Sequence, residues 1–173
     1  MKIFLIFLMP LIVLVGCSSL PSNYKFNNLD DTQVMNFIKQ TNNIKTYRNS
    51  DVLDYSYKIP TKQWINEKFT PFYKDFLFKY SLNTYYEDKN NCNKYTQYAL
   101  TCGHILFKNE KDSTSGALAI GQFRYFKGLD RHSIIFFIVN DNGENKLLFY
   151  EPQIQQLITL TEENLRLCTD WSM

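Results

Sequence analysis

A β-hairpin is predicted by residues 133–150, which read SIIFFIVNDNGENKLLFY. Ser133–Val139 is an almost unbroken run of β-branched and aromatic residues, the pattern of a central strand covered on both faces. Residues 141–143 (Asp-Asn-Gly) form a turn signal, and Leu147–Tyr150 returns as the partner strand. The sequence therefore predicts an antiparallel sheet built around this hairpin.

The segments before the hairpin show mainly helical spacing of apolar residues, and residues 41–60 are polar and irregular. Helices first and an antiparallel sheet second indicate an α+β fold, with N-terminal helices packed on the sheet. The other elements that the spacing predicts are helices from Asp30, from Pro71 and over 92–107, strands over 117–126 and near 157–160, and a helix from Thr161 to Cys168.

The first residues of the chain indicate export. Lys2 is followed by the apolar run Ile3–Val15, which is too short to span a membrane comfortably. The run ends in Leu-Val-Gly-Cys at residues 14–17, followed by Ser18. This ending resembles the lipobox of bacterial lipoproteins. An ordinary signal peptide, or a short anchor with a chance cysteine, is the alternative.

The lipobox resemblance implies a division of the chain. Residues 1–16 would be a removed signal peptide, and residues 17–29 a tether that begins at a lipidated Cys17. Residues 30–173 would form one domain. The protein would be held in the cell envelope by lipid on Cys17. Because Ser18 is not acidic, the outer membrane facing the periplasm is expected if the cell is Gram-negative.

Charge and composition exclude some partners. The net charge is +2, and loss of Lys2 with the signal peptide lowers it to 2 − 1 = +1. Such a balance gives no electrostatic basis for nucleic-acid binding, and no nucleic-acid motif is present. No set of residues has structural-zinc spacing, so we expect neither a metal nor another cofactor. We expect a monomer.

Three cysteines follow the lipobox: Cys92, Cys102 and Cys168. In an oxidising envelope two of them would be expected to pair. Cys92 and Cys102 are about 15 Å apart on one predicted helix, too far for a disulfide. The pairs Cys102–Cys168 and Cys92–Cys168, or no disulfide at all, stay open.

Cys92 is the candidate nucleophile. It opens a predicted helix behind Asn90 or Asn91, and the positive end of a helix dipole favours a thiolate. A thiolate nucleophile needs an imidazole partner. His104 lies roughly 18 Å away along the same helix and is excluded. His132, at the start of the central strand, is therefore the candidate base.

The register of the hairpin supplies candidates for a third member. Depending on where the turn is centred, His132 lies opposite Glu151 or opposite Gln153. A one-residue shift moves side chains to the other face, which excludes Pro152. Glu151 would stabilise an imidazolium, whereas Gln153 would only orient the ring. Glu151 is preferred.

A cysteine at a helix start, a histidine on a strand and an acid on the next strand resemble the papain-like superfold, and within it transglutaminase-like cysteine peptidases. The resemblance rests on Cys92 with Tyr95 and Thr96, on His132 before an apolar strand, and on Glu151-Pro152. Asn93 and Lys94 stand where acidic residues often follow the cysteine.

The resemblance implies a papain-like core and a lipid-anchored hydrolase or acyltransferase that acts on peptide or amide bonds of an envelope substrate. Cys92 would attack the carbonyl, His132 would act as base and then acid, and Glu151 or Gln153 would orient the imidazole. The alternative is a non-catalytic envelope module of the same fold that binds a protein partner or a cell-wall peptide.

Overall fold

The computed structural model describes residues 24–40, 52–85, 91–111 and 115–173. The predicted lipobox and Cys17 lie outside these residues. Within them, no helix is long and apolar enough to cross a membrane. The elements in chain order are β1 (Asn27–Asp30), α1 (Asp31–Gln40), β2 (Ser56–Ile59), α2 (Lys62–Trp64), η2 (Ile65–Phe69), α3 (Thr70–Lys79), α4 (Cys92–Lys108), β3 (Ala117–Leu118), β4 (Ile120–Lys127), β5 (Asp130–Asp141), β6 (Glu144–Glu151), β7 (Gln156–Ile158), α5 (Glu162–Arg166) and β8 (Cys168–Ser172).

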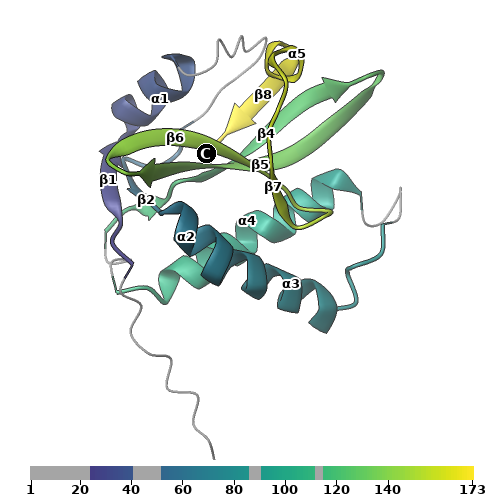
Figure 1. The fold of residues 1–173 in the computed structure, drawn as a ribbon, viewed down its shortest axis with the longest axis horizontal. Helices are drawn as coiled ribbons and strands as arrows, with labels where there is room; N and C mark the ends of the chain where they lie inside the picture. Colours follow the sequence, from purple (N-terminus) through teal and green to yellow (C-terminus); the bar gives the residue numbers. More distant parts are fainter. Residues whose placement is uncertain (1–23, 41–51, 86–90, 112–114) are drawn as a thin grey trace, which may run out of the picture.

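The described strands form two sheets. A small sheet has the order β1-β2-β3, and a larger one has five strands in the order β7-β6-β5-β4-β8. Neighbouring strands of the larger sheet are antiparallel. In Figure 1, α2, α3 and α4 lie on one side of this sheet, while α1 and α5 lie on the other. The helices therefore enclose the central strands from both sides.

The predicted hairpin is confirmed. Strands β5 and β6 pair antiparallel, and Asp141 lies opposite Glu144. This register leaves Asn142 and Gly143 as a two-residue turn, with φ angles of 54° and 89°. Two positive φ angles define a type I′ turn, whose twist matches that of the flanking strands.

Side chains of β5 alternate between two hydrophobic cores. Ile134, Phe136 and Ile138 pack with α1, β2 and α5 on one face of the sheet. The intervening side chains pack with α2, α3 and α4 on the other face. Because both faces are covered, the strand needs no polar side, which explains its unbroken apolar run.

The helix predicted from Pro71 begins earlier than expected. Helices α2, η2 and α3 follow each other without a break from Lys62, whose N-cap is Thr61. The η2 segment is a π-helix, in which Thr70 N–H donates to the Ile65 carbonyl. Pro71 lacks an N–H donor, so the wider turn directly before it lets the helix continue through this point.

The predicted succession of helices and then a sheet is wrong in several places. Strand β2 lies in the segment that was expected to be irregular, and β8 begins at Cys168, where a helix was expected to end. Residues 24–29, predicted to be tether, contribute to the fold, because Phe26 is buried and β1 begins at Asn27. Strands of four or five residues carry too few alternations to be recognised from sequence.

Neither predicted disulfide forms. Cys92, Cys102 and Cys168 are all free thiols. Cys102 belongs to the core under α4, whereas Cys168 belongs to the core on the opposite face of the sheet. Burial raises the pKa of both buried thiols to about 12, so both stay protonated at neutral pH.

We expect alkaline unfolding between pH 10 and 12. Burial raises the pKa of Tyr125 from 10.0 to about 12, and it also raises the pKa of Tyr73 and Tyr150. A phenol whose folded pKa is raised contributes stability that is complete below the unfolded pKa and is lost as the pH rises through the folded one. Circular dichroism and tyrosinate absorbance, recorded together across a pH series, should show the buried phenols ionising as the fold is lost.

The variant Tyr125→Phe is the check on this expectation. It removes one ionisable buried group and should move the alkaline midpoint to higher pH. Ionisation of all tyrosines near pH 10 with an unchanged dichroism spectrum would contradict the prediction.

Candidate functional site

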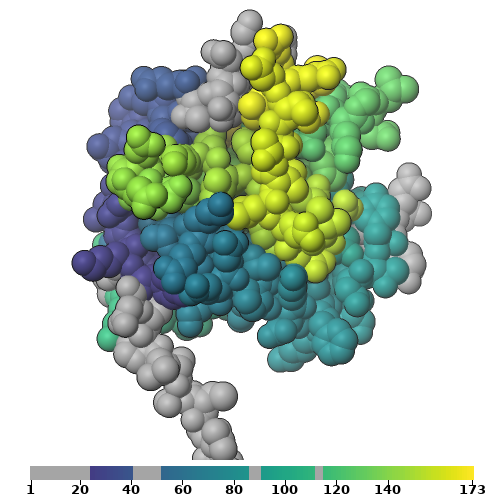
Figure 2. All heavy atoms as spheres, viewed as in Figure 1, coloured from purple at the N-terminus to yellow at the C-terminus, as the bar shows by residue number. Residues whose placement is uncertain are grey.

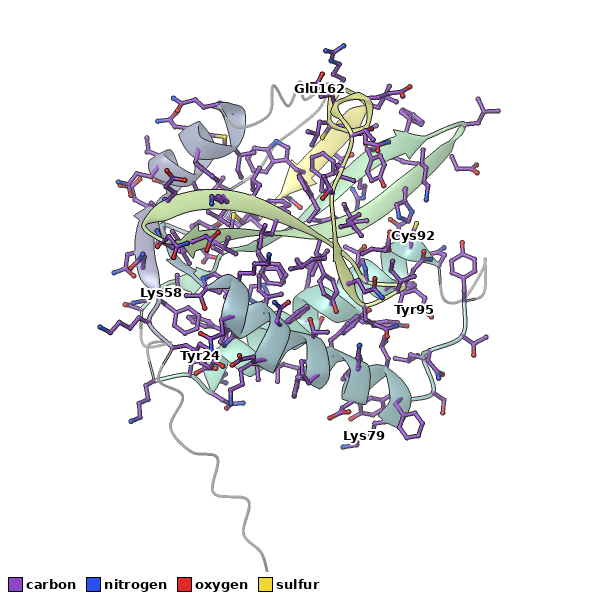
Figure 3. All side chains as sticks on the ribbon, viewed as in Figure 1. Tyr24, Lys58, Lys79, Cys92, Tyr95 and Glu162 are labelled. Carbon is purple, nitrogen blue, oxygen red and sulfur yellow. The ribbon has the colours of Figure 1, made fainter. Side chains whose placement is uncertain are left out.

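An open cleft of about 720 Å³ lies where the start of α4 meets the β4–β5 hairpin. Figure 3 shows Cys92 at this end of α4, beneath the hairpin. The lining is mostly polar, with one exposed aromatic ring. The lining residues are Tyr85, Asn91, Cys92, Asn93, Lys127, Asp130, Arg131, His132 and Gln153.

The start of α4 forms one wall of the cleft. Asn91 is the N-cap, as predicted, and its side chain accepts a hydrogen bond from Lys94 N–H at 3.3 Å. Cys92 is therefore the first helical residue and is partly exposed. Its thiol lies 3.9 Å from the main-chain carbonyl oxygen of Arg131.

His132 and Glu151 form a pair behind the cleft. His132 Nε2 lies 2.5 Å from Glu151 Oε2, and the two side chains are only 13% and 11% exposed. The other carboxylate oxygen of Glu151 accepts from Gln153 N–H at 3.3 Å. The ring of Tyr125 meets the imidazole edge-on at 5.6 Å between centroids. The imidazole is thus held from two sides.

The hairpin register explains why Glu151 reaches the histidine. Ile135 lies opposite Tyr150, so continuation of this register places His132 opposite Gln153. Glu151 is the next residue of the same sheet face, two positions away, and it contacts His132 diagonally. Strand β6 ends at Glu151, which leaves the start of β5 open toward the cleft.

The structure brings the four predicted site residues to one end of the sheet. Cys92, His132 and Gln153 line the cleft, and Glu151 supports His132 from behind. The catalytic roles assigned to them stay predictions. His104 is not among the residues that line the cleft. Among the described residues, no group of three or more His, Cys, Asp or Glu side chains is placed to hold a metal ion.

The charged wall of the cleft was not predicted. Arg131 donates from Nε and Nη2 to Thr169 Oγ1 and from Nη2 to Asp170 Oδ2, the latter at 2.6 Å. Asp170 also pairs with Arg124 at 2.8 Å. Both partners of Arg131 lie on β8, a strand that the sequence did not indicate. The one sequence signal that could have indicated Arg131 as a cleft residue was its position directly before His132.

Comparison with known proteins gives a likeness of fold only. No protein-family model and no curated protein matches the sequence. Two solved structures are similar over 84% of this chain at 13% identity: a PSL1a–E64 complex, with a TM-score of 0.67, and a Polyporus squamosus lectin bound to Neu5Acα2-6Galβ1-4GlcNAc, with a TM-score of 0.65. The chain spans 50% and 49% of the lengths of these two chains.

This likeness corrects two predictions. The papain-like, transglutaminase-like core is wrong, because the fold is shared with the PSL1a and Polyporus squamosus lectin structures, and the chain centres on a five-stranded antiparallel sheet. The main functional prediction, a cysteine hydrolase or acyltransferase, falls with it. A helix-borne cysteine followed by a histidine and an acid on adjacent strands describes a topology, and any sheet with a helix packed on it can supply that order.

Proposed function

We propose that the domain is a non-catalytic binding domain that holds an oligosaccharide in the cleft between α4 and the β4–β5 hairpin. The observation that carries the proposal is the lining of the cleft. It combines an exposed tyrosine ring with amide side chains and an imidazole, and its lining residues include no aliphatic side chain.

These side chains suit a sugar. The exposed ring of Tyr85, which lines the cleft, offers an apolar face and a hydroxyl. Asn93 and Gln153 each carry amide donors and an acceptor, so they can bond the paired hydroxyls of a pyranose. His132, whose Nε2 is occupied by Glu151, presents its remaining ring nitrogen as a further donor or acceptor.

The fold supports the proposal without locating the ligand. One structure of this fold is a lectin bound to a sialylated trisaccharide, and this chain spans half of it. In the proposed role, the His132–Glu151 pair fixes the shape of the cleft wall and Cys92 is a small polar lining residue. The side chains of His132 and Glu151 are mostly buried, as a fixed wall requires.

We also propose that the domain is carried in the cell envelope by lipid on Cys17. The lipobox-like residues 14–17 support this placement. An envelope position would present the cleft to glycans of the cell wall or of the cell surface.

The test is calorimetric titration of the full-length chain, in a mild detergent, with Neu5Acα2-6Galβ1-4GlcNAc and with Galβ1-4GlcNAc. We expect saturable binding of at least one glycan. Tyr85→Ala and Gln153→Ala should each weaken it by about tenfold, which corresponds to ~1.4 kcal/mol. Tyr55→Ala is the matched control, because Tyr55 is 90% exposed and does not line the cleft.

E64 serves as a second probe, because it is the molecule named with one structure of this fold. Intact-protein and peptide mass spectrometry after incubation should show no adduct. A covalent E64 adduct on Cys92 would overturn the proposal. The same holds for peptide cleavage that Cys92→Ala abolishes, and for a lack of binding to both glycans.

A further inference from the structure

We infer that the cleft selects a glycan that carries a carboxylate, and that Arg131 is the residue that recognises it. The inference rests on the proposed oligosaccharide binding and adds the class of sugar.

The Arg131 side chain is held in place by hydrogen bonds, but part of its guanidinium group makes none with any described residue. Its Nε and Nη2 groups donate to Thr169 and Asp170 on β8. Its Nη1 group has no partner among the described residues, and the side chain is 49% exposed in the wall of the cleft. A guanidinium held on one edge presents its free N–H groups in a set direction, which favours a charge-assisted bond to a carboxylate.

Asp170 does not neutralise this wall. It is shared by two guanidinium groups, those of Arg124 and Arg131, so the three residues together keep one positive charge. Asp170 is therefore a positioning residue that orients Arg131 and leaves the group cationic.

Two further charges flank Arg131 at the cleft. Lys127 lines it and forms no ion pair with any described residue. Asp130 also lines the cleft, opposite Lys127 across the hairpin, and offsets that charge. The lining residues Lys127, Asp130 and Arg131 sum to 1 − 1 + 1 = +1. These three lining residues therefore leave a net positive charge on the part of the cleft that Arg131 lines.

The hairpin that carries these charges stands out from the body of the molecule (Figure 2). Its tip residue Leu129 is 99% exposed. A ligand bound beside Arg131 would therefore lie next to a hairpin that projects into solvent. This geometry suits a terminal acidic sugar on a longer glycan.

The test compares a matched pair of ligands on the full-length chain. Neu5Acα2-6Galβ1-4GlcNAc carries one carboxylate, and Galβ1-4GlcNAc lacks the acidic sugar. We expect the acidic glycan to bind about tenfold more tightly at low salt, with the difference shrinking as salt rises. Arg131→Gln should abolish the preference for the acidic glycan.

Arg166→Gln is the control for loss of a surface arginine. Arg166 pairs only with Glu162 on α5 and does not line the cleft, so the preference should persist. Asp170→Asn keeps the shape of β8 but weakens the hold on Arg131, and it should reduce the preference in part. Thermal melts of each variant show whether it is folded.

Equal affinities for the two glycans, or an unchanged preference in a folded Arg131→Gln variant, would overturn this inference and leave oligosaccharide binding intact. Failure of both glycans to bind would instead contradict the proposed function itself. The two failures are therefore distinguishable.

Discussion

Replacing Trp64 with alanine should lower the free energy of unfolding by about 3–5 kcal/mol, a large part of the roughly 5–15 kcal/mol that stabilises a typical domain. Trp64 is fully buried beneath the sheet. Its ring stacks on Phe69 at 6.3 Å and meets Phe26 edge-on at 5.8 Å. Its Nε1–H donates to Glu110 Oε1 at 2.8 Å. The alanine variant removes all of these contacts at once.

The size of the effect follows from where these partners lie. Phe26 belongs to the N-terminal segment, and Glu110 follows α4. Trp64 thus joins the start of the described fold to the helix that carries Cys92. Chemical denaturation followed by far-UV circular dichroism, which reports on the backbone, measures the change in the free energy of unfolding. A shift in the denaturation midpoint with an unchanged slope is expected.

Two variants divide the effect into its parts. Trp64→Phe keeps a ring but loses the hydrogen bond to the buried Glu110 carboxylate, so its cost should be intermediate. Tyr55→Ala removes an aromatic residue that is 90% exposed and should change stability by less than about 0.5 kcal/mol. If Trp64→Ala were as stable as Tyr55→Ala, the core would not be packed as described.

The elements that could be predicted from sequence are those whose signals are local and long. The β5–β6 hairpin has a continuous apolar strand and an Asn-Gly turn, and α4 has an N-cap and more than four turns of periodic spacing. Both were confirmed. β1 and β2 are each four residues long, too short for a period to show. Their pairing depends on contacts between distant segments.

In the site, too, some residues could be predicted from the sequence and others depend on contacts between distant segments. Residue type alone singled out Cys92 and His132, and the hairpin register narrowed the third position to Glu151 and Gln153. The hydrogen bond between Arg131 and Asp170 joins residues that are 39 positions apart in the sequence, and the pairing of β4 with β8 brings them together. No local pattern encodes that contact. The wrong papain-like prediction has a related cause, because residue order on helix and strands does not specify the packing around them.

Replacing Cys17 with serine should abolish lipid attachment completely. The sulfur of Cys17 is the acceptor in the proposed lipoprotein pathway, and a serine hydroxyl cannot form the thioether. Each acyl chain contributes roughly 0.8 kcal/mol per buried methylene, so several chains on one residue hold a protein firmly at a membrane. Metabolic labelling with palmitate in a bacterial host should mark the parent chain and leave Cys17→Ser unlabelled.

The fate of the signal peptide gives an independent readout. Cleavage before Cys17 would remove 16 residues and start the mature chain at residue 17. In the serine variant the precursor should accumulate, and mass spectrometry of its N-terminus should find Met1 or Lys2. Cys92→Ser is the matched control: it loses a thiol within the cleft and should keep both the lipid and the cleavage. Cleavage of the parent chain at another position, with no palmitate incorporated, would show an ordinary signal peptide. The cleft would then face the envelope from a protein without an anchor.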